Sequence, residues 1–185
     1  MERGLFILVT GGARSGKSNY AESIAAQSGK KVIYIATATG NDREMRQRIA
    51  AHRAGRPASF ITIEEPYYPH RIVEKEDHTG TFFLIDCLTL LVSNHLLLED
   101  DGAAPGEVYM ERSEKFLADM KQLAAVLRGS RGAVLLVTNE VGMGIVPANI
   151  ISRIYRDTAG RANQLAAAAA DRVWLVACGL PLVLK

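Results

Sequence analysis

A glycine-rich run that ends in lysine and serine carries the clearest chemistry in this sequence. Residues 11–18 read Gly-Gly-Ala-Arg-Ser-Gly-Lys-Ser and match the pattern G-x-x-x-x-G-K-[ST]. In this pattern the glycines let successive backbone N–H groups point at the phosphates of a nucleotide, the lysine reaches the β- and γ-phosphates, and the last hydroxyl binds Mg²⁺. We therefore expect a protein that binds a nucleoside triphosphate, with Lys17 as a catalytic residue and Ser18 as a metal ligand.

The segments on either side of this loop predict the setting that the motif requires. Leu5–Thr10 is a short apolar run typical of a buried strand, and Asn19–Ser28 has the periodicity of a helix. The positive N-terminal end of such a helix favours a bound anion. A strand, a loop and a helix in this order favour a nucleotide site over a glycine-rich turn without a ligand.

A second acidic candidate lies at the end of another apolar run. Thr81–Asp86 reads as a buried strand whose last residue is a carboxylate, and in phosphate-loop enzymes an acid at this place lies beside the Mg²⁺ ion. Aspartate is also a favoured helix N-cap, so Asp86 could instead cap the helix that follows. Because the phosphate loop lies upstream, we favour the metal role.

One histidine has two possible roles. His52 stands near the end of a predicted helix that Gly55 and Pro57 must terminate. A histidine in a last turn often only interacts with the helix dipole, and the spacing alone favours this interpretation. Alternatively, a neutral imidazole could attack phosphorus and form a covalent intermediate, with Arg53 and Arg56 offering donors to the phosphate oxygens.

A further loop and helix have a pattern that fits an active-site crevice. Residues 137–147 leave an apolar run and enter a glycine-punctuated loop, and loops at the carboxyl ends of parallel strands form the crevice of open α/β sheets. The next helix carries four charged residues on one side. This side could be a solvated face, a subunit contact or a wall for an anionic substrate; its residues are Arg153, Arg156, Asp157 and Arg161.

The composition predicts an ordinary intracellular protein. A length of 185 residues suits a single domain spanning residues 1–185. The 22 basic and 20 acidic residues are well mixed, which gives no support for binding to nucleic acid or to a membrane. Cys87 and Cys178 lie in apolar stretches, so we expect buried free thiols. The apolar start is too short for a signal peptide, so we expect a cytoplasmic location.

Strand-like and helical patterns alternate along the chain. The strands are expected at Leu5–Thr10, Lys31–Thr37, Thr81–Asp86, Gly132–Thr138 and Arg172–Ala177, and the helices at Asn19–Ser28, Asp42–Arg53, Leu88–Leu98, Gly106–Leu127 and Asn149–Ala170. Continuous apolar strands are typical of a parallel sheet that helices cover on both faces, so a three-layer α/β fold is predicted. Leu182–Leu184 follows the last strand too closely for a parallel return and should pair antiparallel with it.

Four segments together resemble a known enzyme family. They are the phosphate loop, the segment 48–57 around His52, and the segments 137–147 and 155–164. They are similar to the bifunctional adenosylcobinamide kinases/adenosylcobinamide-phosphate guanylyltransferases of cobalamin biosynthesis. The similarity extends over nearly the whole chain and is weakest across residues 61–80 and 96–112. It implies a RecA-like P-loop NTPase fold and a homotrimer.

The resemblance also implies two reactions in one enzyme. ATP or GTP would phosphorylate the aminopropanol hydroxyl of adenosylcobinamide, and GMP from GTP would then be transferred to give adenosylcobinamide-GDP and pyrophosphate. His52 would be the guanylylated residue, which reverses the preference that spacing alone gives. The implied nucleotide contacts are Gly11, Gly12, Ala13, Arg14, Ser15, Gly16, Lys17, Ser18, Ala36, Thr37, Ala38, Arg53, Ala54, Gly55, Arg56, Glu64 and Asp86, with Ser18 and Asp86 at Mg²⁺.

Two other functions remain as alternatives. A single-function kinase of small molecules would use the same loop and Asp86 but leave His52 without a role. A RecA-like module would bind nucleotide in order to regulate a partner or to move on DNA, and it would require a basic stripe or DNA binding that weakens with salt.

Overall fold

The computed structural model describes residues 3–40, 43–98 and 104–185. Its seven strands form one sheet in the order β3-β2-β4-β5-β1-β6-β7. The strands are β1 (Phe6–Thr10), β2 (Lys31–Ala36), β3 (Ile61–Glu64), β4 (Thr81–Asp86), β5 (Ala133–Val137), β6 (Arg172–Ala177) and β7 (Leu180–Val183). The helices are α1 (Lys17–Gln27), α2 (Arg43–Gly55), α3 (Pro69–Lys75), α4 (Leu88–Leu96), α5 (Gly106–Gly129) and α6 (Ile150–Ala169). Five side chains of α2 lie outside the description, those of Glu44, Met45, Arg48, Ala51 and His52.

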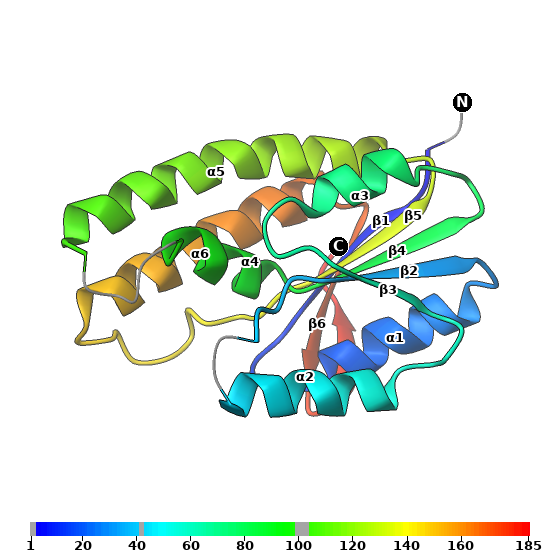
Figure 1. Cartoon of the computed structure of the whole chain (residues 1–185), viewed down its shortest axis with the longest axis horizontal. Helices are drawn as coiled ribbons and strands as arrows, with labels where there is room; N and C mark the ends of the chain where they lie inside the picture. The colour runs from blue at the N-terminus through cyan, green and yellow to red at the C-terminus, as the bar shows by residue number, and fades with distance from the viewer. Residues whose placement is uncertain (1–2, 41–42, 99–103) are drawn as a thin grey trace.

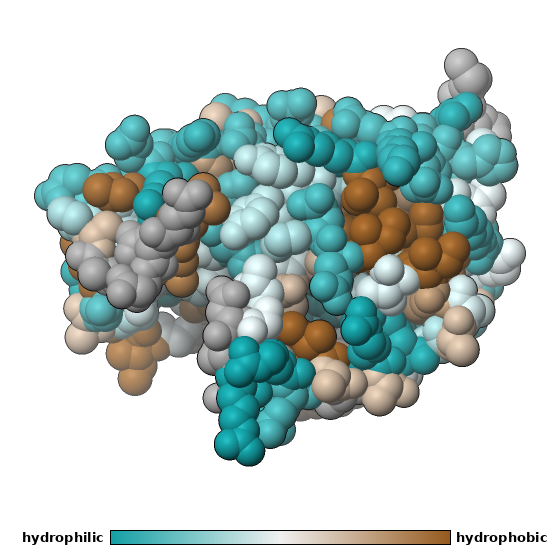
Figure 2. Space-filling view, viewed as in Figure 1, coloured by the Kyte–Doolittle hydropathy of each residue, from teal (hydrophilic) through white to brown (hydrophobic). Residues whose placement is uncertain are grey.

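Helices cover both faces of the sheet. Figure 1 shows α3, α4, α5 and α6 on one face, and α1 and α2 on the other. In the same view Figure 2 shows hydrophilic residues over α5 and α2, with hydrophobic side chains gathered between α3 and the near edge of the sheet. The six strands β1 to β6 pair in parallel and β7 pairs antiparallel with β6. The predicted three-layer α/β fold, with a mostly parallel sheet and an antiparallel C-terminal edge strand, is confirmed.

The continuous apolar strands are explained by the two cores. Along β1, Phe6 and Leu8 pack into the core beneath α4, α5 and α6, whereas Ile7 and Val9 pack into the core beneath α1. Successive side chains of a strand point to opposite faces, so a strand covered on both faces needs apolar residues at every position. The central strands could be predicted for this reason.

The C-terminal hairpin corrects one expectation. Ala177 pairs with Leu180, so only Cys178 and Gly179 form the turn between β6 and β7. Both have positive φ angles, 53° and 79°, as two-residue hairpin turns of type I′ require. The tight turn places Cys178 at the surface, and the prediction of a buried thiol was wrong there. Cys87 is buried, as predicted.

Two short elements were not predicted from the sequence. β3 has four residues on the edge of the sheet and is only partly buried, so it lacks the continuous apolar run of the central strands. α3 has seven residues, which is too short for helical periodicity to be recognised. No helix within the described residues is long and apolar enough to span a lipid bilayer.

Two aspartates fasten loops at the amino ends of the strands. Asp171, just before β6, accepts hydrogen bonds from the Arg3 guanidinium at 2.6 and 2.7 Å and from the Phe6 N–H at 2.9 Å. Asp77, just before β4, accepts from the Ser130 hydroxyl and the Arg131 N–H, both at 2.8 Å. These bonds connect the amino ends of β1, β4, β5 and β6, at the edge of the sheet opposite to their carboxyl ends.

We expect Asp171→Asn to lower stability at neutral pH. The hydrogen bonds from Arg3, and then that from Phe6, hold the pKa of the Asp171 carboxyl well below its usual range. A carboxyl whose pKa is lowered in the folded state stabilises the fold above the pKa of the unfolded chain, and this contribution is lost as the pH falls. Thermal unfolding should therefore give a lower Tm for the variant at pH 7, and the difference should shrink below about pH 4.

The control for this experiment is Asp157→Asn, since the Asp157 side chain is 68% exposed. Its Tm should stay close to that of the wild type at both pH values. If Asp171→Asn lowers the Tm by the same amount at pH 7 and at pH 3, the ionised Asp171 carboxylate does not make the proposed contribution to stability.

Candidate active site

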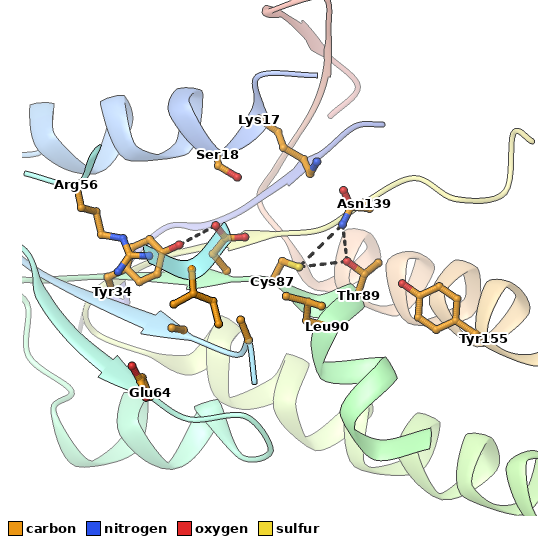
Figure 3. Close-up of a pocket in the computed structure, with 14 residues that line it drawn as sticks. Lys17, Ser18, Tyr34, Arg56, Glu64, Cys87, Thr89, Leu90, Asn139 and Tyr155 are labelled. Carbon is orange, nitrogen blue, oxygen red and sulfur yellow. Dashed lines mark hydrogen bonds between the residues drawn. The ribbon is translucent and has the colours of Figure 1, made fainter. Parts of the chain in front are cut away.

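A pocket of about 280 Å³ lies at the carboxyl ends of the strands. Seven residues that were predicted as site residues line it: Lys17, Ser18, Ala36, Ala38, Arg56, Glu64 and Asp86. Seven more that were not predicted as site residues line it as well: Tyr34, Ile49, Cys87, Thr89, Leu90, Asn139 and Tyr155. The parallel sheet thus brings the phosphate loop, the end of β4 and the loop after β5 to one place (Figure 3).

The phosphate loop is held in a tight backbone turn. Gly16 has a φ angle of 94°, in the left-handed region that glycine favours, and α1 begins directly after it. A Cβ atom on Gly11 would lie 2.4 Å from the carbonyl oxygen of Val176, so only glycine fits against β6 at this position. The Lys17 ammonium group donates to the Gly12 carbonyl at 3.0 Å, and the residue is only 7% exposed.

Neighbouring segments fix the loop on both sides. The Glu140 N–H donates to the Gly11 carbonyl at 3.0 Å, and the Gly179 N–H donates to the Ser15 carbonyl at 2.8 Å. The Ser15 hydroxyl is buried and has no hydrogen-bond partner among the described residues, although buried polar groups are ordinarily paired. A loop at a helix N-terminus with a buried lysine and an unpaired hydroxyl is suited to an anion.

Asp86 does not cap α4, because Cys87 occupies the N-cap position. The Asp86 carboxylate instead accepts a hydrogen bond from the Tyr34 hydroxyl at 2.7 Å. Burial raises the pKa of Tyr34, and the charge and hydrogen bond of Asp86 raise it further. The phenol therefore stays protonated and donates to one carboxylate oxygen, Oδ2.

Arg56 packs against the same tyrosine. Its guanidinium carbon lies 3.4 Å from the centre of the Tyr34 ring, and its Nη1 donates to the Thr62 hydroxyl at 3.2 Å. Its Nε lies 4.0 Å from the Glu22 carboxylate and is buried, with no hydrogen-bond partner in the part of the chain that the structure describes. Burial, only partly offset by Arg56, raises the pKa of Glu22. The residue just after α2 is thus anchored on the sheet beside Asp86.

The other residues predicted on the α2 side have different surroundings. Arg53 forms an ion pair with Glu64 at 2.9 Å, with both side chains 61% exposed. A second hollow shares Ala38 and Glu64 with the pocket and is also lined by Ala54. The Thr37 hydroxyl is buried and bonds to the Cys87 backbone, accepting from its N–H at 2.7 Å, so it is turned away from the pocket. The His52 side chain lies outside the described residues.

The opposite end of the pocket was missed by sequence reasoning. Thr89 stands in an apolar helical run without a recognisable motif, and Tyr155 begins the segment 155–164 of the family resemblance but was given no role of its own. Asn139 begins the glycine-punctuated loop that had been linked with the crevice, although the residue itself was not singled out. The signal for these residues is spatial, because they come from three separate elements (Figure 3).

The sequence matches a known protein family, described as cobinamide kinase / cobinamide phosphate guanyltransferase, over residues 7–184. This chain belongs to that family. The enzyme type expected from the sequence is thereby confirmed, and the chain is a bifunctional transferase of the cobinamide kinase/guanyltransferase family.

Curated relatives of this family member share much of its sequence. The bifunctional adenosylcobalamin biosynthesis protein CobP of Pseudomonas aeruginosa is 44% identical over 178 residues, which cover 96% of each chain. CobU of Escherichia coli is 41% identical over 182 residues, which cover 98% of this chain and 100% of that protein. Among solved structures, a protein from Pyrococcus horikoshii OT3 matches 100% of this chain and 88% of its own, with 11% identity and a TM-score of 0.56. That last similarity concerns the fold alone.

A matched pair of glycine substitutions tests the phosphate loop. We expect Gly11→Ala to weaken nucleotide binding about tenfold or more, because the new Cβ would collide with the Val176 carbonyl and overpacking costs about 1–3 kcal/mol. Gly12→Ala should bind nearly as the wild type does, since a Cβ there has no atom within 4 Å. Isothermal titration with GTP measures both affinities, and equal losses in the two variants would disprove the close-packing argument.

Proposed function

We propose that this family member phosphorylates adenosylcobinamide with ATP or GTP and then transfers GMP from GTP through a guanylyl-His52 intermediate. One observation supports this most strongly. The phosphate loop, Asp86 and Arg56, which directly follows the helix α2 that contains His52, all line the same pocket. Adenosylcobinamide-GDP and pyrophosphate would be the products of the second step.

In the kinase reaction the residues of the phosphate loop hold and neutralise the triphosphate. The N–H groups of the loop face the phosphates, and Lys17 offsets the charge that spreads over the γ-phosphoryl oxygens during transfer. The buried Ser15 hydroxyl, which has no partner within the described residues, would gain one from a phosphate oxygen. Positioning and charge stabilisation account for most of the catalysis of phosphoryl transfer.

A Mg²⁺ ion fits the donors that the chain offers. The Ser18 hydroxyl and the Asp86 carboxylate line the same pocket, and oxygen ligands of this kind, together with substrate phosphates, suit Mg²⁺. When bound, the ion would neutralise charge on the β- and γ-phosphates. Tyr34 holds Oδ2 of Asp86 by a hydrogen bond, which orients the carboxylate toward the pocket.

In the transferase reaction the α-phosphorus is the centre that reacts. A nitrogen of the His52 imidazole would form a bond to it while the bond to the β-phosphate oxygen breaks and pyrophosphate leaves. The phosphate of adenosylcobinamide-phosphate would then attack the same phosphorus and release His52. The loop holds the β- and γ-phosphates in both reactions, so one cradle serves a kinase and a nucleotidyltransferase.

Variants of the two catalytic candidates separate the bifunctional enzyme from a single-function kinase. With GTP labelled at the α-phosphate, the wild type should gain an acid-labile label. His52→Ala should gain none and should still phosphorylate adenosylcobinamide at a rate close to that of the wild type. Lys17→Ala should lose both activities, by about a hundredfold or more, because an electrostatic contact to the transition state is removed.

The outcomes of this experiment are distinct. Guanylyl transfer that persists in His52→Ala would exclude His52 as the nucleophile. A wild-type protein that phosphorylates the substrate but never takes up the label would support the single-function kinase. A protein without either activity that shifts DNA in a gel at low salt would support the regulatory or DNA-moving module.

The role of Asp86 predicts a dependence on magnesium. Asp86→Asn can still accept the hydrogen bond from Tyr34 but lacks the charge that attracts the cation. We expect the Mg²⁺ concentration for half-maximal kinase activity to rise about 10- to 100-fold. Asp119→Asn on α5 is the control, because Asp119 is exposed and does not line the pocket. An unchanged Mg²⁺ requirement in Asp86→Asn would remove Asp86 from the metal site.

As the resemblance to the family implies, we also propose that the protein is a homotrimer in the cytoplasm. It would act on adenosylcobinamide, its phosphate, ATP and GTP, and it would not bind nucleic acid. Light scattering on the purified protein measures the number of subunits, and a mass of one or two subunits at working concentration would argue against the trimer.

A further inference from the structure

The residues at one end of the pocket have no role in the two reactions described above. Figure 3 shows Tyr34 and Arg56 on one side of Lys17, and Asn139, Thr89 and Tyr155 on the other. The first side leads to α2, whose Ile49 lines the pocket. The second side is formed by α4, the loop after β5, and α6, and we call its residues Thr89, Asn139 and Tyr155 the polar trio.

The polar trio places hydrogen-bonding groups beside Cys87 and Leu90, which also line the pocket. The Asn139 amide nitrogen donates to the Thr89 hydroxyl at 2.7 Å, and the Cys87 sulfur lies 3.2 Å from the same oxygen. The Tyr155 hydroxyl points toward Thr89 (Figure 3). Leu90 lines the pocket beside them. Polar groups that converge within an apolar pocket are typical of sites that orient a small ligand.

The surrounding structure holds the trio in place. The Asn163 amide nitrogen donates to the Asn139 carbonyl at 3.0 Å, while the Thr138 hydroxyl donates to the Asn163 amide oxygen at 2.7 Å. Thr89 is only 1% exposed. Side chains that are fixed before the ligand arrives lose little entropy on binding, so this end of the pocket is preorganised.

The trio is uncharged at neutral pH. Burial raises the pKa of Tyr155 to about 12, and burial raises the pKa of the neighbouring Cys87 thiol to about 11. Among the described residues that line this end, Lys17 supplies the positive charge. Neutral donors and acceptors match an alcohol, which both donates and accepts hydrogen bonds, better than they match a phosphate or a carboxylate.

The trio is well placed to bind the substrate hydroxyl that accepts the γ-phosphoryl group. The acceptor oxygen must come within about 3–3.5 Å of the phosphorus, and Lys17, which reaches that phosphate in the motif, lies between the two sides of the pocket. The whole pocket, of about 280 Å³, is at the lower limit for a small-molecule site and would be shared with the triphosphate. Its second side would therefore take only the alcohol-bearing arm of a large substrate, while the rest of that substrate stays outside.

We propose that Thr89, Asn139 and Tyr155 form the acceptor subsite of the kinase reaction and bind the alcohol arm of the substrate. This inference rests on the proposed kinase function. In the step that it supports, the alcohol oxygen forms a bond to the γ-phosphorus, the bond from that phosphorus to the β-phosphate oxygen breaks, and the hydroxyl proton passes to water. The trio aligns the oxygen and holds no charge that would retain the phosphorylated product.

Kinase kinetics on three variants test the subsite. Tyr155→Phe and Thr89→Val each remove one hydroxyl without changing the volume much. We expect either variant to raise the KM for adenosylcobinamide about tenfold, the effect of one hydrogen bond, and to leave the KM for ATP or GTP within about twofold. Thr89→Ser restores the hydroxyl and should restore the KM. Labelling of the protein by GTP should be unchanged in all three.

Tyr68→Phe is the matched control, since Tyr68 lines a separate hollow beside α3 and α5 and its loss of a hydroxyl should change neither KM. An equal rise in the KM for nucleotide and for adenosylcobinamide would assign the trio to the nucleotide and overturn the inference. An active wild type whose variants keep its KM values would also overturn it, while leaving the proposed function intact. A wild type that does not phosphorylate adenosylcobinamide would overturn the proposed kinase function itself, and the inference with it.

Discussion

The parallel pairing of β1 with β5 and of β5 with β4 determines where the other elements and the site can lie. Because these strands run in one direction, their carboxyl ends lie at one edge of the sheet. Asp86 is the last residue of β4, and the phosphate loop and Asn139 lie just beyond the ends of β1 and β5. Parallel strands also need long connections, which become the helices of the two outer layers. The position of the site and the layering of the fold are thus two results of the same pairing.

The polar contacts beneath the pocket join its two sides. Arg56 rests on Tyr34, Tyr34 donates to Asp86, and Asp86 lies next to Cys87, whose sulfur approaches Thr89. The end of α2 and the start of α4 are therefore connected through side chains of β2 and β4. In the proposed enzyme, His52 and the substrate alcohol would react with the nucleotide from opposite sides, and these contacts would hold both sides of the pocket against the same strands.

Sequence reasoning succeeded where a local pattern decides the position in the fold. The motif pointed to Lys17 and Ser18, which line the pocket, and the apolar strands predicted the sheet because they are buried on both faces. Tyr34 and Thr89 were missed, since a tyrosine in a buried strand and a threonine in an apolar helix look like core residues. Their chemistry arises only when neighbouring elements pack together. Cys178 was misplaced because the tight turn after β6 outweighs the apolar character of its surroundings.

The C-terminal hairpin returns the chain to the amino ends of the strands. The Val173 N–H donates to the Lys185 carbonyl at 3.0 Å, and Arg3 bonds to Asp171 two residues earlier. Residues 3 and 185 therefore lie near one another, at the far edge of the sheet from the pocket. A tether, a fluorophore or a solid support attached at either residue would leave the mouth of the pocket open, and the protein could be immobilised there without hindering a bulky substrate.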